Sequence, residues 1–542
     1  MKKKICALIV AFSIALAVIL PVTLTAKKET AMATDGAKPI DIFIIAGQSN
    51  AAGESYTTGV TKETFSNIWY AGEAGPKPTN NGVKITNENT IVDGVTPGYA
   101  YDVTYPFNPV TLGLGSKGTS FGPEFGMAKY LNDKYSADHP AMIFKTATGG
   151  VGLYSYPNHE GGNFNQAGKN GDTKVGFLYR RLLENLENTL NSLEQNGYAP
   201  TIKAFVWMQG EAEMTGGKSV YMSYATKFRD FATSMRDDLS VLTSTSQSNL
   251  PFVIGEVSPT GGYGKPNASY VQQYRDEFIA VQRTIPNYLD NAYLVKSSAF
   301  ETDYVSGNYW HWSGKDMVVI GEMFARTALL EKAMVSDVVS YGECKGIFAI
   351  PEINEAGDKI TFTLKVSDGY GAQSFKINGT EVASSFVNGK YTIDYTDGDT
   401  FNLEMTSKKL EKFDIAVKRR PLTGVNITTN DAVYKNADGS MYVYEGSSLE
   451  ITVTTKNGYE VTGVTINDQP YAYDASTGKI TVELVTEDLE IEIASEQPGE
   501  TPDETPETTP SGDSKKGCGK EGVGLALAGF ATLLAAAFIM KK

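Results

Sequence analysis

The sequence predicts an α/β protein: a parallel β-sheet with helices on both faces, followed by two small β-rich modules. From about Lys38 to Lys332, short apolar runs alternate with segments of helical periodicity, a pattern typical of a parallel sheet covered by helices. After about Val335 the helical periodicity ends, and segments of alternating apolar and polar residues follow, as in antiparallel β structure. A length of 542 residues leaves room for more than one domain.

Five apolar runs in the first domain are the expected strands of its sheet. A helix is clearest between the second and third runs, where leucines recur on one face at positions 178, 182, 186, 190 and 193. A polar stretch from about Glu54 to Ser120 is too long for a plain connection, and we expect it to form walls around a site. The expected strands are Ile40–Ala46, Ala141–Thr146, Ile202–Met208, Phe252–Val257 and Ala292–Val295.

The β-rich part repeats itself at an offset of 89 residues. We therefore expect two tandem modules, residues 336–420 and 421–495. The second module resembles the Ig-like or internalin-type repeats of bacterial surface proteins. A spacer in a stalk is favoured over a carbohydrate-binding module, and the fold alone leaves both readings open. The repeated motifs are Asp368-Gly369-Tyr370 with Asn457-Gly458-Tyr459, Ile377-Asn378 with Ile466-Asn467, and Gly389-Lys390 with Gly478-Lys479.

Both ends of the chain carry segments that we expect to lie outside the folded domains. Residues 1–33 have the lysines, the apolar run and the small residues of a signal peptide. Residues 496–520 are rich in Pro, Thr and Glu, which predicts an extended linker. Residues 521–542 contain an apolar run just long enough to span a bilayer, closed by two lysines. We therefore expect a secreted, Gram-positive-like cell-surface protein that is anchored to the membrane by a C-terminal transmembrane helix.

The composition argues against several classes of function. The net charge of −15 disfavours a nucleic-acid or anionic-polymer partner. Three cysteines are too few for a disulfide framework, and the three histidines form no Cys/His cluster with zinc spacing. We therefore expect neither a bound metal nor a cofactor.

The most informative motif is Gly47-Gln48-Ser49-Asn50, which follows the apolar run Ile40–Ala46. A serine at this point can lie at the carboxyl edge of a parallel sheet, where open α/β sheets bind ligands. It can also begin the next helix, whose free N–H groups favour a developing negative charge. One position can thus supply a nucleophile and part of an oxyanion hole.

Three further blocks carry residues suited to the same chemistry. Residues 146–152 (Thr-Ala-Thr-Gly-Gly-Val-Gly) contain glycines, which allow backbone N–H groups to approach a developing charge closely. Residues 207–213 (Trp-Met-Gln-Gly-Glu-Ala-Glu) overlap the end of the run Ile202–Met208. Residues 308–314 (Asn-Tyr-Trp-His-Trp-Ser-Gly) contain His311. A histidine can take a proton from a serine and return it to a leaving alcohol near neutral pH.

Together these blocks resemble the SGNH hydrolases, and most closely the carbohydrate esterase branch of sialate O-acetylesterases and acetylxylan esterases (carbohydrate esterase family six). The match at residues 207–213 is the most specific, and the resemblance covers about Lys38 to Lys332 of an expected esterase domain of residues 38–335. It implies a flavodoxin-like three-layer α/β/α fold, with Ser49 as the nucleophile and His311 as the base. It also implies an oxyanion hole made by the backbone N–H groups of Ser49 and Gly150 and by the side chain of Gln209. Gly149 matches the same block, and Gly150 is preferred.

The sequence departs from the family pattern at one position. The family usually has an aspartate three residues before its histidine, where this chain has Asn308. An asparagine can orient the imidazole of His311 but cannot stabilise its positive charge. The missing carboxylate must come from elsewhere, with Glu211 as the first candidate and Asp303 as the second, or the enzyme works as a dyad.

The resemblance implies a serine hydrolase that removes O-acetyl groups from an acetylated glycan. Xylan, sialic acids and cell-wall glycan remain open as substrates. Two other functions are weighed against this one. The first is a surface protein that binds glycans through an inactive hydrolase domain, which Asn308 would explain. The second is an esterase or lipase for long acyl chains, which the polar stretch disfavours.

Overall fold

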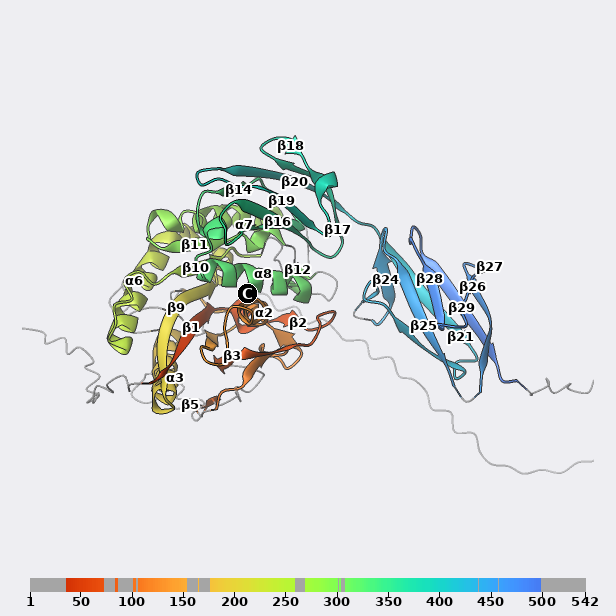
Figure 1. Cartoon of the computed structure of the whole chain (residues 1–542), viewed down its shortest axis with the longest axis horizontal. Coiled ribbons are helices and arrows are strands. Elements are labelled where there is room, and N and C mark those ends of the chain that lie inside the picture. Colours follow the sequence, from red (N-terminus) through yellow and green to blue (C-terminus); the bar gives the residue numbers. More distant parts are fainter. Residues whose placement is uncertain are drawn as a thin grey trace, which may run out of the picture.

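The computed structural model describes residues 36–72, 83–85, 101–103, 106–153, 164, 176–258, 269–300, 302–303, 308–436, 438–456 and 458–498. Within these ranges the chain forms an α/β domain and two β-rich modules in series (Figure 1). The predicted signal peptide, most of the linker and the predicted anchor lie outside the described residues. Within the described part of the chain, no helix has the length and apolar character needed to cross a membrane.

The α/β domain is built on a seven-stranded sheet. All neighbouring strands are parallel except the last pair, β3 and β6, which is antiparallel. The predicted parallel sheet is therefore confirmed, and all five predicted strands are present. Two more strands, β3 and β6, come from the polar stretch that was expected to form walls. In spatial order the strands are β11 (Ala292–Val295), β10 (Phe252–Gly255), β9 (Tyr198–Met208), β1 (Lys38–Gly47), β8 (Ala141–Ala147), β3 (Thr64–Gly72) and β6 (Pro109–Thr111).

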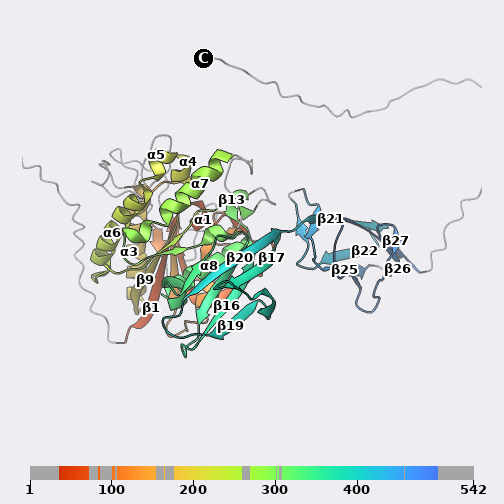
Figure 2. The same cartoon turned by 90° about the horizontal axis from the view of Figure 1, so that it is seen from above.

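Helices cover both faces of this sheet, as the alternation of strands and helices predicted (Figure 2). On one face, Ile42 and Ile44 of β1 pack in a core with α3 (Phe177–Gln195), α6 (Tyr224–Thr243) and α7 (Ser269–Gln282). On the other face, Phe43 and Ile45 pack in a second core with α2 (Pro123–Leu131) and α8 (Gly314–Ala328). Successive residues of a strand point to opposite faces, so β1 contributes to both cores.

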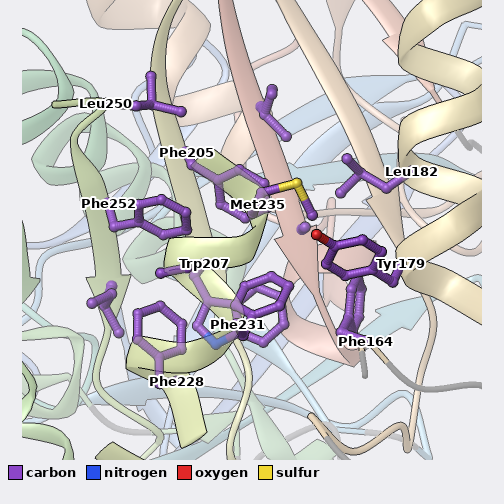
Figure 3. Close-up of a cluster of buried hydrophobic side chains, with 14 of the residues drawn as sticks. Phe164, Tyr179, Leu182, Phe205, Trp207, Phe228, Phe231, Met235, Leu250 and Phe252 are labelled. Atoms are coloured by element: carbon purple, nitrogen blue, oxygen red, sulfur yellow. The ribbon is translucent and has the colours of Figure 1, made fainter. Parts of the chain in front are cut away.

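Aromatic side chains fill the first core beneath the end of β9 (Figure 3). Trp207 lies against Phe164 and Phe231, with ring centroids 4.9 Å apart in both pairs. Its indole N–H donates to the hydroxyl of Tyr224 at 3.0 Å, so this buried polar group is satisfied. These contacts hold the carboxyl end of β9, which leads into residues 209–213, in a rigid environment.

The first β-rich module consists of two small sheets. One contains β14 (Val339–Tyr341), β20 (Phe401–Lys409), β17 (Tyr370–Ile377) and β18 (Thr380–Glu381). The other contains β15 (Ile347–Ile353), β16 (Lys359–Val366) and β19 (Lys390–Asp394).

The second module has the same plan, with two additional strands at one edge. One sheet contains β23 (Tyr434–Lys435), β24 (Met441–Tyr444), β21 (Lys412–Arg420), β29 (Leu489–Glu496), β26 (Glu460–Ile466) and β27 (Gln469–Pro470). The other contains β22 (Val425–Thr429), β25 (Leu449–Thr455) and β28 (Lys479–Val482).

The backbone has the same conformation at equivalent positions of the two predicted modules. Asn378 and Asn467 both have a φ of 50°, and Gly389 and Gly478 have φ values of 71° and 72°. Equivalent turns therefore use the same left-handed conformation at the predicted offset. The boundary between the modules differs from the expected one at residue 420, because β21 pairs with β24 and β29 of the second module.

The first module packs directly on the α/β domain, over α8 (Figure 1). Phe348 and Ile350 of β15 belong to the same hydrophobic core as the α8 side chains. A polar contact joins all three parts of the chain: the ammonium of Lys315 lies 3.3 Å from a carboxylate oxygen of Asp368 and 3.1 Å from the hydroxyl of Tyr434. The first module is therefore part of the scaffold of the α/β domain.

The remaining elements are short. They are α1 (Ser49–Ala52), β2 (Ser55–Tyr56), β4 (Val83–Ile85), β5 (Tyr101–Val103), β7 (Ser120–Phe121), α4 (Glu211–Thr215), α5 (Lys218–Tyr221), β12 (Thr302–Asp303), β13 (Asn308–Trp312), α9 (Lys332–Val335) and the 3-10 turns Ile285–Asn287, Ser297–Ala299 and Ala383–Ser385.

Candidate active site

Ser49 lies at the carboxyl edge of the sheet, where β1 ends. The turn depends on Gly47, which has a φ of 142° and packs against the neighbouring strand. A Cβ atom at this position would lie 2.0 Å from the carbonyl oxygen of Met208, a distance that no side chain tolerates. Gln48 follows, and Ser49 begins the short helix α1. The chain thus places Ser49 as the sequence predicted, between a strand and a helix.

Ser49 lines a cavity of about 300 Å³ at this edge. The walls come from the carboxyl-terminal side of β1, from the loop after β8, from the segment after β9 and from β13, so the cavity unites all four sequence blocks. Because the carboxyl ends of parallel strands converge, segments more than a hundred residues apart in sequence meet here. The lining residues are Gln48, Ser49, Gly150, Glu211, Ala212, Thr215, Trp310 and His311.

Gly150 and Gly149 form an exposed turn after β8. Gly150 lines the cavity and has a φ of 70°, which favours glycine. A Cβ atom on Gly149 would lie 3.7 Å from the Cβ atom of Ser49, so this glycine also adjoins the serine. Of the two glycines that matched the family block, Gly149 therefore adjoins Ser49 and Gly150 lines the same cavity.

Gln209 lies behind the cavity wall, and only 1% of it is exposed. Its amide nitrogen donates to the side-chain oxygen of Gln48 at 3.2 Å, to the carbonyl oxygen of Val151 at 3.1 Å and to the carboxylate of Glu213. These hydrogen bonds connect the turn before Ser49 to the loop after β8 that carries Gly149 and Gly150. A hydrogen bond from Gln209 to an oxyanion would require it to exchange one of these acceptors.

Glu211 lies at the start of α4 and is 6% exposed. One carboxylate oxygen accepts a hydrogen bond from the Asn50 amide at 2.7 Å. Among the described residues, its other oxygen is buried without a hydrogen-bond partner. Burial raises the pKa of Glu211 to about 7. Burial therefore favours the protonated, uncharged form of Glu211.

His311 lies on β13 and is half-buried. Burial lowers the pKa of His311 to about 4, while the charge of Glu54 raises it and that of Lys117 lowers it further. At neutral pH the imidazole is therefore uncharged and able to accept a proton. The strand is held on both sides of His311: the Trp310 carbonyl accepts from Asn50 at 3.3 Å, and the buried Trp312 indole donates to the Phe300 carbonyl at 3.1 Å.

The two other predicted site residues lie on the hairpin that carries His311. Asp303 ends β12, Asn308 begins β13, and the two residues face each other in the antiparallel pair. Within the described part of the chain, no group of His, Cys, Asp or Glu side chains is arranged to hold a metal ion.

Several residues that contribute to the site were not singled out from the sequence. Asn50 links three blocks, because its amide donates both to Glu211 and to the carbonyl of Trp310. Gln48 accepts from Gln209 and from the backbone N–H of Ala212 at 3.2 Å. In the sequence, the only indication of their role was their position on either side of Ser49.

The fold and the cavity define a carboxylic ester hydrolase of the SGNH type. The chain belongs to the carbohydrate esterase family described as sialic acid-specific acetylesterase, whose family model matches residues 39–330. The resemblance drawn from the sequence blocks is thereby confirmed. A comparison with curated protein sequences finds no match.

Solved structures similar to this chain include three proteins of low sequence identity. A protein from Arabidopsis thaliana is 17% identical, with 54% of this chain and 98% of that chain covered and a TM-score of 0.34. NanS is 15% identical over the same shares of the two chains, with a TM-score of 0.37. A carbohydrate acetylesterase from Xanthomonas citri is 13% identical, with 74% of this chain and 78% of that chain covered and a TM-score of 0.31.

Proposed function

We propose that the protein removes O-acetyl groups from a cell-surface or extracellular glycan, with Ser49 as nucleophile and His311 as general base. The observation that carries this proposal is that Ser49, His311 and Gly150 line one cavity at the carboxyl edge of the sheet. The uncharged state of His311 at neutral pH is consistent with this role, because only a neutral imidazole can accept the serine proton. Membership of a carbohydrate esterase family supports acetylated sugar as the substrate class.

The reaction would proceed in two steps. The Ser49 oxygen attacks the acetyl carbonyl while His311 takes the hydroxyl proton, and the backbone N–H groups of Ser49 and Gly150 stabilise the oxyanion. Gln209 would join them if its amide turned from Gln48 or Val151. The C–O bond to the sugar then breaks, and His311 returns the proton to the sugar hydroxyl. Water, activated by the same histidine, finally hydrolyses the acetyl-serine to acetate.

The test is acetate release by the purified full chain from O-acetylated sialic acid and from acetylated xylan. Ser49→Ala and His311→Ala should each lower the turnover by a factor of about 10³ or more. The preferred glycan is the one with the higher kcat/KM. Release that persists unchanged in Ser49→Ala would refute the proposed nucleophile.

Two alternatives have distinct outcomes in the same assay. No release from either glycan or from a small acetyl ester would favour an inactive domain that binds glycans. A steep preference for long acyl chains over acetate would favour a lipase-like esterase. We favour the acetylesterase because a cavity of about 300 Å³ lies at the small end of ligand sites.

We further propose that residues 1–33 direct export and that residues 521–542 anchor the protein to the membrane. The apolar runs in these segments support the proposal. A tagged chain should fractionate with membranes, and deletion of residues 521–542 should release it into the medium. Recovery of the full chain in the soluble cytoplasmic fraction would refute both assignments.

A further inference from the structure

The segment that follows the serine helix runs alongside the strand that carries His311. At one end, the Asn50 amide lies 3.3 Å from the carbonyl oxygen of Trp310. At the other end, a Cβ atom on Gly314 would lie 2.2 Å from the carbonyl oxygen of Tyr56, so these two backbones touch. These contacts place residues 51–55 beside residues 311–313. Glu54 is the acidic residue in this stretch.

The backbone at the start of Glu54 is held firmly. Gly53 follows the last residue of α1 and has a φ of 101°, and its carbonyl accepts from the Ser116 N–H at 2.9 Å and from the Ser120 hydroxyl at 2.8 Å. A Cβ atom on Gly53 would lie 2.6 Å from the backbone nitrogen of Gly122. The loop before α2 therefore fixes the position of the backbone at Gly53, and with it the start of Glu54.

The side chain of Glu54 is also held in place, and 19% of it is exposed. The Ser116 hydroxyl donates to one carboxylate oxygen, and the ammonium of Lys117 lies 3.3 Å from the other. The charge of this carboxylate acts on the imidazole of His311 and raises its pKa, against the effect of Lys117. Glu54 is thus a carboxylate in a defined position whose field favours the protonated histidine.

We propose that Glu54 is the positioning carboxylate of His311, in the role that Asn308 cannot fill. It stabilises the imidazolium that forms when His311 takes the proton of Ser49, so the inference rests on the proposed function. Glu211 suits this role less well, because burial raises its pKa to about 7 and the charges that act on His311 are those of Glu54 and Lys117. A carboxyl group whose uncharged form is favoured by burial stabilises a cation less well than a carboxylate that stays charged.

The test compares pH profiles of kcat/KM for the full chain and its variants, since the acidic limb of the profile reports the pKa of the catalytic base in the free enzyme. Glu54→Gln should lower kcat about 10- to 100-fold, at or below the lower end of general acid–base contributions, because Glu54 acts through His311 and is partly exposed. Its acidic limb should move to lower pH, because the imidazolium loses a favourable charge. Glu54→Asp keeps the charge and should recover part of the lost kcat and part of the shift of the acidic limb.

Lys117→Met provides the opposite shift. Removing the ammonium takes away the charge that opposes protonation of His311, so the acidic limb should move to higher pH. Glu63→Gln is the matched control, because Glu63 also pairs with a surface lysine, Lys129. It should leave both kcat and the profile unchanged.

Any of three results would overturn the inference. The first is a Glu54→Gln enzyme with kcat within twofold of the wild type, and the second is a Glu54→Gln enzyme with a lower kcat and an unmoved acidic limb. The third is a Glu211→Gln enzyme whose acidic limb moves to lower pH while that of Glu54→Gln stays in place. Failure of the proposed function is recognised separately, because the wild type would then release no acetate, or Ser49→Ala and His311→Ala would retain acetate release.

Discussion

A buried ion pair beneath the serine helix gives the sharpest test of how the site is supported. Lys145 of β8 and Glu124 of α2 lie 3.0 Å apart, and both side chains are fully buried. The Lys145 ammonium also donates to the carbonyl oxygens of Ala52 at 3.0 Å and Leu114 at 2.8 Å. Since Ala52 ends α1, the pair fixes the helix that begins with Ser49.

Lys145→Met leaves the carboxylate of Glu124 buried without its counter-charge. Breaking a buried pair on one side costs about 3–5 kcal/mol of unfolding free energy. In the double variant Lys145→Met/Glu124→Gln no charge is left uncompensated, so it should recover about 1–3 kcal/mol relative to Lys145→Met. The sign of this coupling distinguishes a paired charge from simple loss of packing.

Tryptophan fluorescence during urea unfolding measures the effect in the right domain. All four tryptophans belong to the α/β domain, at positions 69, 207, 310 and 312. With a slope of about 3 kcal/mol per M urea, a loss of about 3–5 kcal/mol lowers the midpoint by about 1–1.7 M.

Lys129→Met is the control for the buried pair, because it breaks the exposed pair with Glu63 and should cost at most about 1 kcal/mol. Equal midpoints for Lys145→Met and Lys129→Met would refute the reasoning. So would a double variant at Lys145 and Glu124 that is less stable than Lys145→Met alone.

Three further predictions concern the domain interface and the acidic residues. Truncation after residue 335 removes Phe348 and Ile350 from a core that they share with the α/β domain. At roughly 1.5–3 kcal/mol for each lost side chain, the urea midpoint of the α/β domain should fall by about 1 M or more. Truncation after residue 410 keeps both side chains and should change the midpoint little. Burial raises the pKa of Asp316 from 3.8 to about 7, so between these pH values the folded state binds a proton that the unfolded chain releases. The free energy of unfolding should therefore fall as the pH rises from about 4 to 7. Measurements of Tm against pH should show a flatter trend for Asp316→Asn. Glu211→Gln should lower kcat for acetate release far more than Asp303→Asn, because Glu211 lines the cavity of Ser49; equal or reversed losses would refute this.

The central strands were predictable because their sequences are nearly continuous apolar runs, as buried parallel strands require. The strands β3 and β6 were not predicted. In β3 the residues Phe65, Ile68 and Tyr70 are buried, while Thr64 and Ser66 are exposed. A bulge between residues 65 and 69 interrupts the alternation on which a strand prediction depends. Strands near the end of a sheet, such as β3 and the edge strand β6, depend on tertiary contacts more than on local pattern.

The four site blocks were predictable because each one either follows a predicted strand or contains a recognisable sequence motif. Glu54 was beyond prediction, since its relation to His311 depends on the loop that carries Ser116 and Lys117 folding back over α1. The contacts of Gln209 were also hidden, because nothing in a single sequence shows that Val151 and Glu213 take up its amide. Local motifs indicate which residue types gather at the site, whereas tertiary packing determines which of their side chains form contacts.

The first β-rich module bears on catalysis through α8, the helix that begins directly after the histidine strand. Ser313, two residues after His311, caps α8 by accepting the N–H of Asp316 at 3.1 Å. The carboxylate of Asp316 in turn accepts from the hydroxyl of Ser367 in the first module at 3.0 Å. A continuous chain of contacts thus runs from the module to the base. Because general-base catalysis depends on the placement of the imidazole, loss of this module should reduce kcat as well as stability, which a passive spacer would not do.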